Sequence, residues 1–255
     1  MLSDNRMKRI YATVRTLSDR GVCDVGTDHA FIPIELVRDG RVSFAVATDI
    51  SLPSVRKGEK NIAENGLADK ISTHCANGTL GVPLDGIGDI IIAGMGGELI
   101  AEILSADPRL RDSALHFVLQ PMTKQPELRD FLVNNGFLIE KEYCERDGDR
   151  IYFIMSVYYK GFNRPISLRD SLLGVGTEDD RNLFEYAKKL RGLLGIRLEG
   201  LRVASDSALY TPEMLSINEK LAFLDSYISE NDSRFRPPMR DSKDIPYTFI
   251  ERLRQ

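Results

Sequence analysis

Short polar motifs stand where three successive apolar runs end. The first run ends in Asp24-Val25-Gly26-Thr27-Asp28, the second in Asp49, and the third in Asn77-Gly78. A carboxylate can hold a ribose or an ammonium group, an amide can bond a nucleobase edge, and a glycine lets the backbone approach a ligand closely. Each motif alone is also a common turn former. Because the carboxyl ends of parallel strands meet at one edge of a sheet, we expect the three motifs to line one crevice.

The glycine pattern of the first motif discriminates between two classes of nucleotide ligand. A pyrophosphate requires G-x-G-x-x-G, so that a helix N-terminus can meet the anion. Here Asp28 and Phe31 stand at the second and third glycine positions. The Asp28 carboxylate would repel a pyrophosphate but attract an ammonium or sulfonium group. The sequence therefore favours S-adenosylmethionine over NAD as the cofactor.

A fourth apolar run ends in Ala93-Gly94-Met95-Gly96-Gly97, with three glycines in four positions. Glycines at this edge let backbone groups line a methyl donor and leave room for a planar acceptor. The alternative is a tight turn before a helix that begins at Glu98. We favour the binding role, because core packing does not explain so many glycines.

The elements around these motifs alternate between strands and helices. Strand-like runs begin at Val22 and cover 44–50, 70–78, 89–97 and 116–122, and helical patterns cover 32–38, 54–66, 98–105 and 127–137. This alternation is typical of a parallel sheet with right-handed crossovers. Two further strand-like runs flank Asp147-Gly148, a strong hairpin signal. We therefore predict an α/β fold with a Rossmann-like sheet, in which an antiparallel hairpin closes the parallel strands. This arrangement resembles the sheet of class I methyltransferases.

Two amphipathic helices are predicted after this sheet, over 181–204 and 214–231. Their expected inward stripes are Leu183, Tyr186, Ala187, Leu190, Leu194, Leu198 and Leu201 in the first helix, and Leu215, Ile217, Leu221, Leu224 and Ile228 in the second. We expect a C-terminal α-helical hairpin that either contacts a partner or packs as a lid. The predicted domains are residues 1–163 for cofactor binding, 164–232 for the hairpin and 233–255 for a tail.

Composition limits the remaining possibilities. The chain has 255 residues, 42% of them hydrophobic, and a net charge of −4. We expect a soluble, cytoplasmic protein without a membrane span or a signal core. Cys23, Cys75 and Cys144 are far apart and are expected to be reduced core residues. The three histidines are too scattered to suggest a metal site.

The motifs carry a family resemblance. The segments DVGTDHAFIPIELV (24–37), IIIAGMGGELIAEIL (90–104) and FVLQPM (117–122) resemble the hallmark motifs of TrmK, the bacterial tRNA (adenine(22)-N1)-methyltransferase family. Met122 departs from that family's pattern, in which asparagine tends to follow the Gln-Pro pair. The resemblance covers about residues 1 to 160, and the helical hairpin agrees in architecture. It implies S-adenosylmethionine-dependent methylation of adenine N1 in tRNA, at position 22.

Candidate roles follow for individual residues. The candidate cofactor-binding residues are Asp24, Gly26, Thr27, Asp49, Ile50, Asn77, Gly78, Gly94 and Met95. The candidate catalytic residues are Asp28 and His29, which would stabilise the positive charge that grows on the adenine. The candidate substrate-binding residues are Gly96, Gly97, Gln120, Pro121, Lys188, Lys189 and Arg191.

Positive charge is concentrated in two segments, residues 1–20 and 181–202. We expect tRNA to dock on both, since phosphates respond to the local field rather than to the net charge of the chain. Two other functions stay open. One is a methyltransferase that acts on another RNA or on a small molecule, and the other is a catalytically silent module that binds S-adenosylmethionine or RNA.

Overall fold

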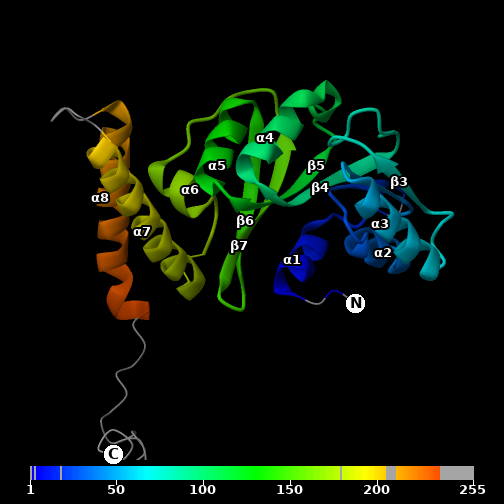
Figure 1. Ribbon diagram of the computed structural model, residues 1–255, viewed down its shortest axis with the longest axis horizontal. Helices are drawn as coiled ribbons and strands as arrows, with labels where there is room; N and C mark the ends of the chain where they lie inside the picture. Colours follow the sequence, from blue (N-terminus) through cyan, green and yellow to red (C-terminus); the bar gives the residue numbers. More distant parts are fainter. Residues whose placement is uncertain (1, 3, 18, 179, 205–210, 236–255) are drawn as a thin grey trace, which may run out of the picture. The chain divides into compact units, whose positions relative to one another are not determined.

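The computed structural model describes residues 2, 4–17, 19–178, 180–204 and 211–235 (Figure 1). It divides into two compact units, Met1–Leu190 and Arg191–Gln255. The first unit contains a seven-stranded sheet among its described residues, in the order β3-β2-β1-β4-β5-β7-β6. The strands are β1 (Gly21–Val25), β2 (Ala45–Asp49), β3 (Ile71–Cys75), β4 (Ile87–Gly96), β5 (His116–Thr123), β6 (Phe137–Asp147) and β7 (Arg150–Tyr159).

Strand pairing puts the four motifs at the ends of β1, β2, β3 and β4 on the same edge of the sheet, where the carboxyl ends of these strands lie. β1 pairs in parallel with both β2 and β4, so the chain reverses its direction across the sheet at β1. Ligands of open α/β sheets bind at such a switch point, outside the carboxyl ends of the strands. β7 runs antiparallel to both β5 and β6 and closes the sheet. The predicted class I methyltransferase sheet with its closing hairpin is confirmed.

Helices cover both faces of this sheet (Figure 1). α1, α2 and α3 contact one another on one face, and α4, α5 and α6 contact one another on the other. Their bounds are α1 (Asn5–Thr13), α2 (Phe31–Arg38), α3 (Leu52–Glu64), α4 (Gly97–Ala106), α5 (Gln125–Asn134) and α6 (Leu168–Leu173). A short 3-10 turn, η1, spans Pro108–Leu110. The central strands β1, β4 and β5 are mostly apolar because both of their faces are covered.

The buried ion pair that holds α6 was not predicted from the sequence. Arg129 of α5 and Glu142 of β6 are both fully buried, and the guanidinium donates to the carboxylate at 2.9 and 3.0 Å. The Arg129 guanidinium also donates to the carbonyl of Ser171, and Glu142 accepts from the backbone N–H of Val175. This pair therefore joins α5 and β6 to the segment that follows the methyltransferase sheet.

The second unit contains most of the helical hairpin formed by α7 (Arg181–Ala204) and α8 (Pro212–Phe235). Leu198, Met214 and Ile217 are buried together in it. Leu194, Leu201 and Leu221 pack against them. Met214 takes the place predicted for Leu215, which is 57% exposed. That prediction was wrong by one residue, because neighbouring apolar residues lie only about 100° apart around a helix axis.

The cysteines depart from the expected pattern at one position. Cys23 is buried in β1, and Cys144 is partly buried in β6. Cys75 is exposed at the end of β3, so the prediction that it belongs to the core was wrong. β3 lies at the edge of the sheet, where side chains meet solvent.

Two negative findings apply to the described part of the chain. No helix there is long and apolar enough to cross a membrane. Among the same residues, no group of three or more His, Cys, Asp and Glu side chains is placed to hold a metal ion.

We predict that Glu142→Ala lowers the free energy of unfolding by about 3 to 5 kcal/mol, because it leaves the Arg129 charge buried without a partner. Urea unfolding followed by circular dichroism measures the change. The double variant Arg129→Met/Glu142→Leu should lie closer to the parent than Glu142→Ala does. Glu64→Ala, which breaks an exposed pair with Lys60, is the control and should change the free energy by less than about 1 kcal/mol. Equal effects of Glu64→Ala and Glu142→Ala would contradict the prediction.

Candidate functional site

A pocket of about 220 Å³ lies at the carboxyl ends of β1, β2, β3 and β4. Seven of the nine candidate cofactor-binding residues line it, namely Gly26, Asp49, Ile50, Asn77, Gly78, Gly94 and Met95. Val25, Ala76, Ala93, Leu99 and Ile103 complete the lining and were not singled out from the sequence. Leu99 and Ile103 lie one turn apart on α4, a spacing that the sequence alone cannot distinguish from an ordinary core stripe.

The other two cofactor-binding candidates, Asp24 and Thr27, do not line the pocket. Asp24 is 6% exposed at the end of β1, and its carboxylate accepts a hydrogen bond of 2.7 Å from the Thr27 hydroxyl. Burial and, to a smaller extent, the nearby Asp49 carboxylate together raise the pKa of Asp24 to about 6, against the lowering effect of the Thr27 hydrogen bond. Two carboxylates beside one pocket create a negative potential that favours a cationic ligand.

Asp49 is held in place by the backbone around it. Its carboxylate accepts from the N–H of Ser51 at 2.8 Å and from the N–H of Asp28 at 3.3 Å. The side chain is partly exposed toward the pocket that it lines. Each oxygen keeps a lone pair for a further donor such as a ribose hydroxyl.

Gly26 is required by both backbone conformation and space. Its φ is +75°, a value that other residues rarely adopt. A Cβ atom at this position would stand 2.2 Å from Cε of Met95. The first and fourth motifs therefore touch across the pocket, and any side chain at position 26 would displace Met95.

The turn between β1 and α2 has an uncommon backbone conformation on both sides of the candidate catalytic residue His29. Asp28 and Ala30 have φ values of 45° and 55°, in the left-handed region. α3 supports the turn from outside, since Lys57 lies 3.4 Å from the Asp28 carboxylate and Asn61 donates to the carbonyl of His29 at 2.9 Å. Non-glycine residues in this region typically store about 1 to 3 kcal/mol each and concentrate at functional sites.

Gln120 connects the fourth motif to α1. It is fully buried, and its Oε1 accepts from the N–H of Gly94 at 3.1 Å and from the Arg6 guanidinium at 3.2 Å. Its Nε2 donates to the carbonyl of Pro121 at 3.0 Å and lies 3.5 Å from Sδ of Met122. Sequence reasoning named Gln120 but missed Arg6, because a base on an amphipathic helix is usually a solvated residue.

The other substrate-binding candidates are spread over several places. Gly96 and Gly97 begin α4, where a Cβ on Gly97 would stand 2.5 Å from the carbonyl oxygen of Lys124. Lys188 and Lys189 are exposed on α7. Arg191 bonds the Asp225 carboxylate at 2.9 Å within the second unit. Close packing of α4 against Lys124 thus accounts for Gly97 without a ligand.

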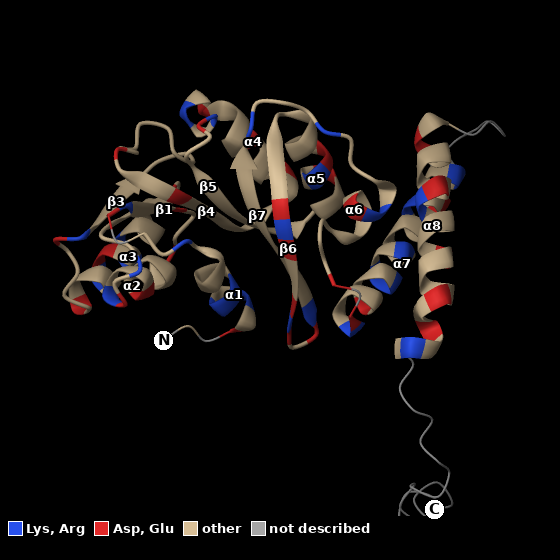
Figure 2. Ribbon diagram, turned by 180° about the vertical axis from the view of Figure 1, so that it is seen from behind, with Lys and Arg blue, Asp and Glu red and all other residues tan. Residues whose placement is uncertain are grey.

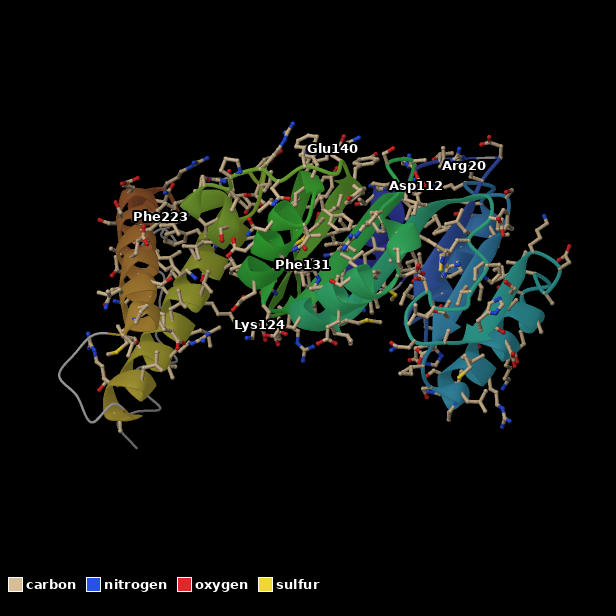
Figure 3. The ribbon with its side chains drawn as sticks, turned by 90° about the horizontal axis from the view of Figure 1, so that it is seen from above. Arg20, Asp112, Lys124, Phe131, Glu140 and Phe223 are labelled. Carbon is tan, nitrogen blue, oxygen red and sulfur yellow. The ribbon has the colours of Figure 1, made fainter. Side chains whose placement is uncertain are left out.

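A separate Ser-His-Asp cluster lies near the amino ends of β4 and β5. Nδ1 of His116 bonds Asp89, and Nε2 of His116 lies 2.9 Å from Oγ of Ser156. The Ser156 hydroxyl donates to the Glu140 carboxylate at 3.0 Å, so the hydroxyl proton is not directed to the His116 imidazole. Glu140 belongs to β6 and is labelled in Figure 3. All three triad members are at least nine-tenths buried. The cluster is therefore structural and not a nucleophilic site.

Comparisons with known proteins agree with this geometry. The methyltransferase domain family matches residues 3–155, which include every residue that lines the pocket. The chain belongs to this family. Its matched region ends within β7, so the family covers the sheet and leaves the helical hairpin outside.

Individual relatives are more specific. The Bacillus subtilis tRNA (adenine(22)-N(1))-methyltransferase is 29% identical over 143 residues, which cover 55% of this chain and 60% of that protein. A crystal structure of a Streptococcus pneumoniae putative tRNA (m1A22) methyltransferase is 25% identical, with a TM-score of 0.74 over 89% of this chain and 100% of that one. Another structure of that protein, in complex with S-adenosyl-L-methionine, is 26% identical with a TM-score of 0.67, over 89% of this chain and 100% of that one. The predicted resemblance to the TrmK family is confirmed.

The raised pKa of Asp24 predicts how stability of this methyltransferase domain depends on pH. In the unfolded chain the carboxyl ionises near pH 4, whereas in the folded protein it ionises near pH 6. The folded state therefore binds more protons between these values, and the contribution of Asp24 to the free energy of unfolding falls as the pH rises through them.

Asp24→Asn is neutral at every pH and escapes this loss. We expect the variant to gain about 2 kcal/mol relative to the parent as the pH rises from about 4.5 to about 7.5, as measured by urea unfolding at both values. Asp69→Asn, at an exposed position, is the control and should show no such gain. A gain that does not change with pH would mean that Asp24 ionises normally in the folded protein.

Proposed function

We propose that the protein transfers a methyl group from S-adenosylmethionine to N1 of an adenine in tRNA, at position 22. The observation that carries this proposal is the pocket at the carboxyl edge, where Gly26, Asp49, Asn77 and the Gly94-Met95 segment meet. The names of the Bacillus subtilis and Streptococcus pneumoniae relatives support the choice of tRNA adenine. The chain spans 60% of the length of the Bacillus subtilis relative.

The residues around the pocket fit the cofactor. S-adenosylmethionine supplies an electrophilic methyl group on a positively charged sulfur. Asp24 and Asp49 provide the negative potential that favours its charged ammonium and sulfonium groups. Asp49 offers acceptors for ribose hydroxyls, and Asn77 offers an amide for the adenine edge.

On the acceptor side, positioning supplies most of the catalysis. Adenine N1 carries an in-plane lone pair, so the protein has only to align it with the methyl group and exclude water. Positive charge grows on the adenine as the bond forms. The Asp28 carboxylate, half exposed at the rim and 3.4 Å from His29, is placed to stabilise that charge.

The basic surface for tRNA lies on α7 more than on α1. Figure 2 shows Lys and Arg on both helices. The α1 arginines are engaged within the first unit, since Arg6 donates to Gln120 and Arg9 pairs with Glu145. Lys188 and Lys189 remain exposed on α7 and are suited to phosphates. We therefore assign tRNA docking first to Lys188 and Lys189, with a smaller share on Arg191, whose guanidinium already bonds Asp225, and on the N-terminal helix.

Asp49→Ala should weaken S-adenosylmethionine binding by about 1 to 3 kcal/mol, because ribose hydroxyls lose a charged acceptor. Isothermal titration calorimetry measures the dissociation constant. Asp49→Asn, which keeps one oxygen acceptor for the neighbouring N–H groups, should fall between Asp49→Ala and the parent. An affinity equal to that of the parent in both variants would show that the ribose is held elsewhere.

The function is tested with labelled S-adenosylmethionine and total bacterial tRNA, followed by nucleoside analysis. We expect 1-methyladenosine in the tRNA, and we expect S-adenosylmethionine but not NAD to raise the melting temperature, since only a ligand of the native state stabilises it. Label in another nucleoside, or only in small molecules, would favour the alternative acceptors. Absence of S-adenosylmethionine binding would overturn the proposal.

A further inference from the structure

Five of the six large apolar side chains that are exposed among the described residues of the first unit lie at the edge of the sheet that holds the cofactor pocket; the sixth, Phe162, follows β7. Phe31, Ile50, Leu52, Leu80 and Leu99 are each between 44% and 72% exposed. Each one follows the carboxyl end of a strand, from β1 to β4. Large side chains left in water at one edge of a sheet mark a surface that another molecule covers. Ile50 and Leu99 line the cofactor pocket itself, whereas Phe31 lies outside its lining.

Phe31 is held in a defined orientation by its neighbours. Its ring stacks on the His29 imidazole, with centroids 5.1 Å apart and planes within 5° of parallel. The left-handed conformations of Asp28 and Ala30 flank His29 on either side, and Asn61 fixes the His29 carbonyl. A strained backbone thus presents two stacked rings, one of them 49% exposed, at the surface.

The stacked pair stands next to the cofactor site. The N–H of Asp28, which precedes His29 directly, donates to the carboxylate of the pocket residue Asp49 at 3.3 Å. Lys57 of α3 lies 3.4 Å from the Asp28 carboxylate, and Arg56 beside it is exposed. An aromatic face bordered by cations has the chemistry that binds unpaired nucleotides, in which the base stacks and the phosphate meets the charge.

We propose that the Phe31–His29 pair is a stacking platform for an unpaired nucleobase of the RNA substrate, with Lys57 at its phosphate. This platform rests on the proposed function, because it assumes an RNA acceptor. It adds a base-recognition element that is separate from the cofactor pocket and from the basic surface on α7. Stacking does not depend on which base is stacked, so the platform contributes affinity and orientation but no sequence preference.

The direct test measures binding of a fluorescein-labelled single-stranded RNA of five adenosines by fluorescence anisotropy, with the full chain and S-adenosylmethionine present. Phe31→Leu, which keeps an apolar side chain but removes the flat ring, should raise the dissociation constant about tenfold. Phe31→Tyr should bind as the parent does. Phe162→Leu is the matched control, because Phe162 is also 49% exposed and also lies beside a cation, Arg164.

Salt dependence separates stacking from charge. Phe31→Leu should leave the slope of log affinity against log salt unchanged, whereas Lys57→Ala should reduce its magnitude by about 0.7, the value for one phosphate of a single strand. With tRNA as substrate, Phe31→Leu should raise KM with little change in kcat or in S-adenosylmethionine affinity. A merely structural role for Phe31 would instead alter the melting temperature and cofactor affinity.

The outcomes distinguish this inference from the proposed function. If the parent methylates tRNA and Phe31→Leu matches it in KM and in RNA binding, the platform is overturned and the function stands. If the parent methylates no RNA, the proposed function fails. The anisotropy measurement then decides the platform on its own. The platform is overturned if the parent does not bind the RNA. It is also overturned if Phe162→Leu loses as much binding as Phe31→Leu does.

Discussion

The burial of Asp24 at the end of β1 is the constraint on which the ligand-binding edge depends. A carboxylate without water is unfavourable, and the pKa of about 6 reflects that burial and the nearby Asp49. The Thr27 hydroxyl offsets part of this unfavourable term and in doing so shapes the turn after β1. A cationic ligand would offset more of it. The folded protein therefore stores free energy that becomes available when such a ligand binds.

The same turn carries candidate residues for both substrates of the proposed reaction. Its first part, at Gly26, forms the wall of the cofactor pocket and touches Met95 of the fourth motif. Its second part, from Asp28 to Phe31, contains two left-handed residues, and α3 braces it through Lys57 and Asn61. One short, braced turn thus carries both the wall of the pocket and the residues proposed to meet the acceptor.

The strands, the closing hairpin and most of the pocket were predictable because their signals are local. Buried parallel strands read as apolar runs, and polar residues at their ends fall at one edge of the sheet whatever the helices do. The Arg129–Glu142 pair was not predictable, because charged residues usually lie at the surface and nothing local shows that 13 residues of chain bring these two together in the core. Leu215 and Met214 show a further limit, since helical periodicity cannot separate adjacent apolar residues.

The α1 segment shows why charge counted along a sequence is a poor guide to a nucleic-acid surface. Its arginines look like a basic face, yet Arg9 bonds Glu145 and Arg15 reaches Asp89 within the sheet. Their charge is balanced locally, so each adds little to the field that a phosphate meets. With a net charge of −4, attraction of the proposed tRNA substrate depends on the cations that keep solvent access. Contacts that do not depend on charge, such as stacking on an exposed aromatic ring, then carry a larger share of the affinity than in a basic protein.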